Sequence, residues 1–314
     1  MPANDLMSSH IHSTYFAPRG RRRIYQLGMQ ISQLYLSPFD RIIGIIGDAG
    51  SGKSVLTKGM FPGLELTNDD NGVNVRPLPL LDQDNEQGFF TPHTYHLDIR
   101  FEMGFHQMTE LADAIHQAVQ RGKRVVVEHF DLIYPTLGVN ADLLVGIGEE
   151  IVISRPTMFG PEPQELRNVV YKSLPYRLMA HTAEDLCESL MPEEIMERCS
   201  HGDVHHGFIL TFDGDKPGLD LVQLEQRVLE AIRQDLPVDY IDESHISIGG
   251  RRLVCTGPRT HVRSTGRIEN FCLLHEFIYD RKRRQYILVG CVGEGARDRL
   301  EHFRSIAEKH LFGE

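Results

Sequence analysis

Apolar and polar positions in the first half of the chain follow two spacings in turn. Apolar residues from Tyr25 onwards recur every three or four positions up to the break at Pro38, which predicts a helix. The uninterrupted apolar run at 42–46 predicts a buried strand. The same reasoning predicts a helix over 109–121 and strands over 124–128 and 150–154. Strands that alternate with helices are typical of a parallel sheet with crossover helices.

The second half has a different pattern, and it begins after a proline-containing segment at 161–163 that we interpret as a linker. Several short strand-like runs follow one another there, which is typical of antiparallel pairing. The predicted elements are helices over 176–190, 221–236 and 296–310, and strands over 208–212, 245–248, 252–255, 271–277 and 286–292.

The length of 314 residues exceeds the usual size of one domain. A hydrophobic fraction of 41% supplies enough apolar material for two cores. We therefore predict an N-terminal arm over 1–24, an α/β domain with a parallel sheet over 25–160, and an α+β domain with an antiparallel sheet over 165–314.

Eight residues directly after the strand at 42–46 match the pattern GxxxxGK[ST] at every fixed position. They are Gly47, Asp48, Ala49, Gly50, Ser51, Gly52, Lys53 and Ser54. In such a P-loop, glycines let backbone N–H groups turn towards phosphates at a helix N-terminus. Lys53 is expected to contact the β- and γ-phosphates, and the Ser54 hydroxyl to ligate Mg²⁺. The motif predicts binding of a nucleoside triphosphate, which we take to be ATP, with Mg²⁺.

Acidic residues near the ends of neighbouring strands are candidates for the chemistry around the metal. Glu128 ends the strand over 124–128 and Asp131 follows it, so either could contact the Mg²⁺ shell through water; the alternative is a surface acid that closes a strand. Asp69 and Asp70 follow a short strand-like run, and either could accept the proton of an acceptor hydroxyl. The alternative for that pair is a plain turn.

Charge and composition limit which binding partners and which cellular compartment we expect for this chain. The net charge of −11 argues against a broad nucleic-acid surface, although basic residues gather over 251–284. The first sixteen residues contain no apolar run long enough for a signal sequence, so none is expected, and no apolar run reaches the length of a membrane span. The five cysteines form no CxxC pair and are expected to be reduced thiols. We expect a cytoplasmic protein without a membrane partner.

The segment over 40–155 resembles the uridine-kinase-like P-loop kinases. The likeness is carried by IIGIIGDAGSGKS, by the two aspartates at 69–70, and by VVVEHFDLI followed by ADLLVGIGEEIVIS. This resemblance implies a phosphotransferase or NTPase fold. The chain shows no pattern that marks a uridine site or an arginine-bearing lid.

Three segments of the second half resemble the second additional domain of alanyl- and threonyl-tRNA synthetases. They are AHTAEDLCESL at 180–190, GFILTFDGDKPGLDLVQLEQRVLEAIRQDLPV at 207–238 and CTGPRTHVRSTGRIENF at 255–271. The order and spacing of the segments suggest that the resemblance covers 170–314.

In that family the first and third segments supply zinc ligands beside an editing pocket. The matching positions here are His181, Asp185, Cys255 and His261. Asp185 stands where the family has a histidine, and two extra residues separate Cys255 from His261, so the alternative to a Zn²⁺ site is an inherited fold with a decayed site. We interpret the histidines over 201–206 as a solvated loop rather than as substitute ligands.

Three functions remain open at this point. The first is an ATP-dependent, kinase-like enzyme whose second domain selects a substrate or a tRNA. The second is an aminoacyl-tRNA deacylase with a regulatory nucleotide domain, and the third is a non-catalytic, nucleotide-gated tRNA sensor. The sequence does not identify the phosphate acceptor, the aminoacyl group or the oligomeric state.

Overall fold

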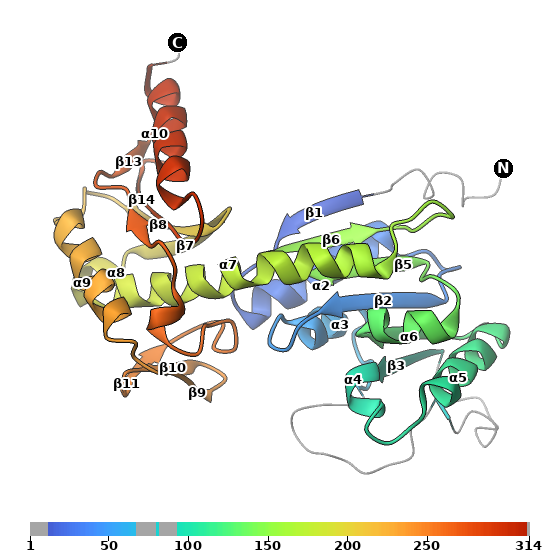
Figure 1. Ribbon diagram of the computed structural model, residues 1–314. Coiled ribbons are helices and arrows are strands. Elements are labelled where there is room, and N and C mark those ends of the chain that lie inside the picture. Colours follow the sequence, from blue (N-terminus) through green and yellow to red (C-terminus); the bar gives the residue numbers. More distant parts are fainter. Residues whose placement is uncertain (1–11, 67–79, 82–92, 313–314) are drawn as a thin grey trace. The chain divides into compact units, whose positions relative to one another are not determined.

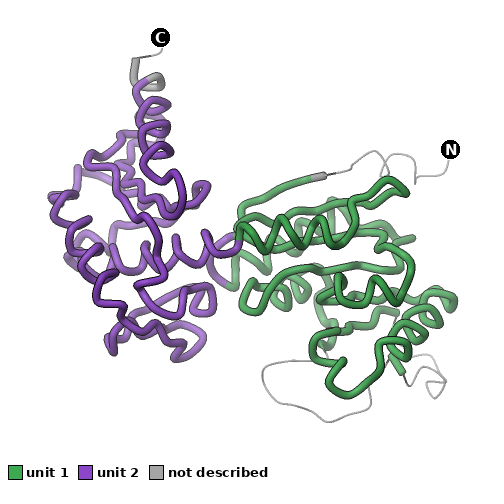
Figure 2. The backbone as a smooth tube through the Cα atoms, in the orientation of Figure 1, with its two compact units in different colours: residues 1–17, 21–173 green, residues 18–20, 174–314 purple. Residues whose placement is uncertain are grey.

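The protein is represented by a computed structural model that describes residues 12–66, 80–81 and 93–312. The chain divides into two compact units, coloured separately in Figure 2. Unit 1 comprises residues 1–17 and 21–173, and unit 2 comprises residues 18–20 and 174–314. A short N-terminal segment therefore belongs to the same unit as the C-terminal half.

Unit 1 is built on a six-stranded mixed sheet in the order β1-β6-β5-β2-β4-β3 (Figure 1). Its strands are β1 (His12–Phe16), β2 (Ile42–Gly47), β3 (Thr94–Asp98), β4 (Arg124–Glu128), β5 (Leu143–Ile147) and β6 (Glu150–Ser154). β2 is parallel to both β4 and β5, and β3 is parallel to β4. β6 and β1 are antiparallel to their neighbours.

The expectation of a parallel sheet therefore holds for β2 and β4 and is wrong for β6, the strand predicted over 150–154. Only residues 148–149 connect β5 to β6, and a connection this short makes a hairpin because a parallel crossover needs a dozen residues or more. β1 falls within the N-terminal arm predicted over 1–24, and it pairs with β6 along its whole length.

Helices cover both faces of this sheet. They are α2 (Arg21–Tyr35), α3 (Lys53–Met60), α4 (Ile99–Glu102), α5 (Met108–Gln120) and α6 (Phe130–Leu137). Alternate residues of β2 enter different cores: Ile43 packs with α2 and α3, whereas Ile42 packs with α5 and α6. The apolar run at 42–46 is thus buried on both sides, as a central parallel strand requires.

Unit 2 is α+β with two antiparallel sheets. One has the order β12-β14-β8-β7, with β13 also paired to β14, and the other has the order β11-β10-β9. The strands are β7 (Cys199–Val204), β8 (Gly207–Asp213), β9 (Val238–Asp242), β10 (His245–Ile248), β11 (Arg251–Val254), β12 (Cys272–Leu273), β13 (Ile278–Asp280) and β14 (Gln285–Cys291). The helices are α8 (Glu193–Met196), α9 (Leu221–Arg233), η1 (Thr265–Arg267) and α10 (Ala296–Phe312).

The long helix α7 (Pro163–Ser189) begins at the last residue of the predicted linker over 161–163 and extends the predicted helix over 176–190 far towards the N-terminus. Proline is tolerated at the first turn of a helix, which accounts for Pro163. Pro175 lies in the helix interior, where it removes one backbone donor, and the helix nevertheless continues. Buried side chains such as Val170 and Leu186 anchor α7 on both sides of Pro175. Among the described residues, no helix combines the length and the apolar character needed to span a bilayer.

Candidate functional site

The glycine-rich loop (residues 47–54) connects β2 directly to α3. Gly50 and Gly52 have positive φ angles of 77° and 97°, a region that side-chain-bearing residues rarely adopt. A Cβ atom on Gly52 would also lie 2.9 Å from Ile24 Cδ1. The sequence motif and the backbone therefore agree: the loop is tightly wound, and it ends at the N-terminus of a helix, where backbone N–H groups are unpaired.

Lys53 is the first residue of α3 and is almost fully buried, at 7% exposure. Its ammonium donates a hydrogen bond to the Asp48 carbonyl oxygen at 2.9 Å, so the side chain folds back across the glycine-rich loop. Burial lowers the pKa of Lys53 below its ordinary value, against the opposing effect of the Glu128 and Asp98 carboxylates. A buried ammonium at a helix N-terminus favours an anionic ligand.

Glu128 and Asp98 lie side by side because they end two paired parallel strands, β4 and β3. Glu128 is buried, and its Oε1 lies 3.3 Å from His96 Nε2. Although burial opposes ionisation, His96 and then Lys53 hold the pKa of Glu128 below its ordinary value. Burial and the charge of Glu128 raise the pKa of Asp98. Glu128 is therefore the more readily ionised member of the pair and the one better suited to contact a cation.

Two more residues complete the edge of the site. Arg100 follows β3, and its guanidinium lies 3.0 Å from Asp48 Oδ1 in the glycine-rich loop. The same guanidinium donates to the Tyr171 hydroxyl at 3.3 Å.

Asp131, the alternative to Glu128, is instead ion-paired with Arg167 at 3.1 Å. Asp69 and Asp70 lie outside the described residues.

Sequence reasoning missed His96, Asp98 and Arg100. All three follow from one omission, because the strand β3 was not predicted. Its five residues, TYHLD, alternate apolar and polar side chains: Tyr95 and Leu97 enter the core, and His96 faces Glu128. That period-2 alternation before an acid was the available signal.

In unit 2 the structure brings together three of the four candidate zinc ligands. One possible ligand atom each from Asp185, Cys255 and His261 lies within 4.8 Å of the others. His261 Nε2 is 2.9 Å from Asp185 Oδ2 and 3.8 Å from Cys255 Sγ. The two extra residues between Cys255 and His261 do not separate them.

His181 is not part of this group. Its Nδ1 lies 3.1 Å from the Thr260 hydroxyl, and its Nε2 lies 3.8 Å from an Asp203 carboxylate oxygen. Burial lowers the pKa of His181 to about 3, so the imidazole is neutral. Spacing of i and i+4 put His181 and Asp185 on one helix face, but the two side chains have different partners.

Arg19 occupies the position beside these donors. It is 3% exposed, and its guanidinium donates to the carboxylates of Glu184 and Asp185. The guanidinium also lies 3.3 Å from Cys255 Sγ. Burial alone would raise the pKa of the Cys255 thiol, but His261 and Arg19 together lower it to about 7.

The donor set of Asp185, Cys255 and His261 suits zinc by residue type. Arg19, however, donates to two of those donors, and an arginine side chain keeps its positive charge at every accessible pH. A zinc ion in the same place would face an unscreened like charge. With Arg19 in this position, the group does not fit a zinc ion.

Comparisons with known proteins add little. No protein-family model matches the chain, and no curated protein matches it. Among solved structures, an ornithine aminotransferase from Toxoplasma gondii ME49 matches at 11% identity and a TM-score of 0.22, over 82% of this chain and 71% of that one. A likeness at that TM-score carries no argument about fold or function.

Proposed function

We propose that unit 1 binds a nucleoside triphosphate with Mg²⁺ at the glycine-rich loop and transfers or hydrolyses its γ-phosphoryl group. The observation that carries the proposal is the buried Lys53 ammonium at the start of α3, with Glu128 and Asp98 on the neighbouring strand ends. The strand order around β2, with parallel neighbours on both sides, supports a P-loop kinase-like fold.

The chain's own groups have separate roles in this proposal. Backbone N–H groups of residues 50–54 bind phosphate oxygens, and Lys53 exchanges its hydrogen bond to the Asp48 carbonyl for one to the β- and γ-phosphates. Ser54 and Glu128 would hold Mg²⁺, directly or through water, and that ion would neutralise charge on the phosphates. His96 keeps Glu128 ionised and oriented. Asp69 and Asp70 stay candidates for the base.

Hydrolytic editing of aminoacyl-tRNA receives no support from unit 2, because Arg19 lies among the candidate zinc ligands. The resemblance over 170–314 still favours tRNA or a related substrate as the partner of this unit. The function that we propose for the chain is therefore nucleotide-dependent, with unit 2 in a selecting role.

The test is nucleotide binding by the full chain, measured calorimetrically with ATP and Mg²⁺. Lys53→Ala should weaken binding roughly 10- to 100-fold, because a hydrogen bond to a charged group is worth about 1.5–3 kcal/mol. Lys58→Ala, on the same helix, is the matched control and should leave affinity unchanged. Equal affinity in the wild type and in Lys53→Ala would contradict the proposal.

A further inference from the structure

A second cluster of possible metal ligands lies on α7 and β7 of unit 2. Glu184 and Glu188 are one helical turn apart on α7, and His201 belongs to β7. One ligand atom from each lies within 4.8 Å of the others. The proposed nucleotide site uses none of these residues, so this cluster stands independently of it.

The fold directs the three side chains to one place. β7 is an edge strand that pairs with β8, and His201 lies opposite Leu210 in that register. Side chains opposite each other on neighbouring strands share a face of the sheet. Leu210 packs in the core with Ala183 and Leu186 of α7, so His201 is on the face that α7 covers. The segment at 201–206 that we interpreted as a solvated loop begins, in fact, in this strand.

Glu184 has one buried carboxylate oxygen that is unpaired among the described residues. Glu184 Oε2 accepts a hydrogen bond from Arg19, but Glu184 Oε1 has no hydrogen-bond partner within the described part of the chain. The side chain is only 3% exposed. A buried polar atom left unpaired costs roughly 1–3 kcal/mol, and more if it is charged.

The other two residues of the cluster contact each other directly. His201 Nε2 is hydrogen-bonded to Glu188 Oε1, so the two side chains already converge on one point. Three carboxylates of α7, at positions 184, 185 and 188, lie in this region with the single guanidinium of Arg19, so a cation shared by Glu184, Glu188 and His201 would have negative charge around it.

We propose that Glu184 Oε1, Glu188 and His201 bind one divalent transition-metal ion of the zinc type. Two carboxylates with one imidazole form a ligand set that zinc accepts, with a fourth position left for water, whereas Mg²⁺ and Ca²⁺ prefer oxygen ligands alone. Arg19 does not block this site, because it donates to Glu184 Oε2 and leaves Oε1 free for the ion. Glu188 and His201 are partly exposed, so the ion can enter from solvent.

The test uses zinc alone as the probe. Full-length protein without an affinity tag is stripped with chelator, dialysed and titrated with ZnCl₂ by calorimetry, and bound zinc is counted by mass spectrometry. The wild type should bind about one zinc per chain. His201→Asn and Glu188→Gln should each weaken binding at least about tenfold, because each removes one of the three ligands.

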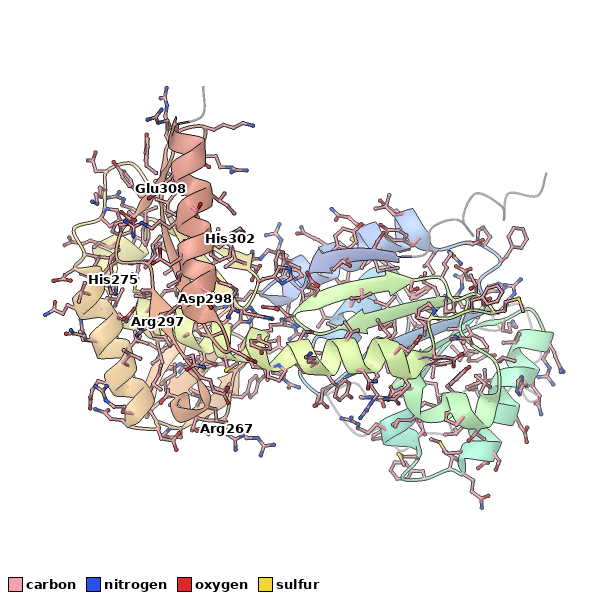
Figure 3. All side chains as sticks on the ribbon, turned by 45° about the horizontal axis from the view of Figure 1, so that its top comes forward. Arg267, His275, Arg297, Asp298, His302 and Glu308 are labelled. Atoms are coloured by element: carbon pink, nitrogen blue, oxygen red, sulfur yellow. The ribbon has the colours of Figure 1, made fainter. Side chains whose placement is uncertain are left out.

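Two variants are controls for the location of the site. Cys255→Ala alters the neighbouring donor group, and His275→Asn removes another imidazole beside a carboxylate, 3.2 Å from Glu225 (His275 is labelled in Figure 3). Both should bind zinc like the wild type. Absence of zinc binding by the wild type, full affinity in His201→Asn, or loss of binding in Cys255→Ala would each overturn the assignment. Far-UV circular dichroism confirms that each variant is folded, and His201 is exposed enough for its replacement to be tolerated.

Discussion

The buried guanidinium of Arg19 offers a direct test of how unit 2 is held together. The change is Arg19→Met, which replaces the charged side chain by an apolar one of similar length. Glu184 and Asp185 then lose their hydrogen-bond donor while they stay buried. Removal of one partner from a buried ion pair is strongly destabilising, by about 3–5 kcal/mol, because the remaining charge is uncompensated.

Protonation sets an upper limit to the cost of each uncompensated carboxylate. The ordinary pKa of a glutamate is 4.5, so neutralising one carboxyl at pH 7 costs about 3.4 kcal/mol at 1.36 kcal/mol per pH unit. At pH 5 the same step costs only about 0.7 kcal/mol. In the variant the folded-state pKa of Glu184 rises further above the unfolded value, so the folded state binds more protons and loses stability as the pH rises. The deficit relative to the wild type should therefore be larger at pH 7 than at pH 5.

The cysteines provide an assay specific to unit 2. All five lie at position 187 or beyond, and Cys187 and Cys291 are fully buried. Pulsed alkylation in increasing urea, read by mass spectrometry at these two thiols, reports the unfolding of unit 2 even though the chain lacks tryptophan. At m-values of about 1–3 kcal/mol/M, the midpoint should fall by at least about 1 M at pH 7.

The matched control is Arg22→Met, which removes an exposed arginine three residues away and should leave the midpoint unchanged. The double variant Arg19→Met with Glu184→Gln should recover part of the loss, because the second change removes one uncompensated charge. A deficit below about 1 kcal/mol at pH 7, or an equal deficit at pH 5 and pH 7, would refute this account of Arg19.

Two further predictions concern the proposed nucleotide site. Glu128→Gln should lower the rate of phosphoryl transfer or ATP hydrolysis about 10²- to 10³-fold with little change in nucleotide affinity, because it removes a charge near the metal and keeps the side-chain shape. The control is Asp131→Asn, which alters an acid that is ion-paired with Arg167. Equal rates in both variants would contradict the role of Glu128. Asp69→Asn or Asp70→Asn should lower the same rate about 10²- to 10⁴-fold if that residue is the base. Full turnover in both single variants and in the double variant would leave the pair as turn formers.

The sequence was informative wherever the cause of structure is local. The buried strand, the glycine-rich loop and the start of α3 are adjacent in the chain, so one pattern of residue types predicts all three. β3 and α7 show the opposite case. β3 is five residues long and depends on its partner β4, while α7 continues through Pro175 because side chains on both sides of that proline are buried. Tertiary packing determines both β3 and α7, and a local sequence pattern contains no information about that packing.

The candidate site in unit 2 shows the same limit more sharply. Arg19 and Glu184 are separated by 165 positions, and no spacing rule could connect them. The resemblance to the synthetase domain implied that His181, Asp185, Cys255 and His261 would converge, and the structure brings only three of these four together. It could not reveal that an arginine from outside the resembling segment would supply the positive charge there.

The charges on α7 explain why two neighbouring donor groups should differ. The Asp185 carboxylate is hydrogen-bonded to two side chains, Arg19 and His261. Glu188 has His201, and Glu184 has Arg19 on one oxygen alone. The planar Arg19 guanidinium carries one charge and donates hydrogen bonds in fixed directions. It contacts Asp185, Cys255 and Glu184 Oε2 but does not bond to Glu184 Oε1. An ion bound by Glu184, Glu188 and His201 would supply the positive charge that Arg19 does not bring to Glu184 Oε1. An ion bound by Asp185, Cys255 and His261 would instead be repelled by the Arg19 guanidinium.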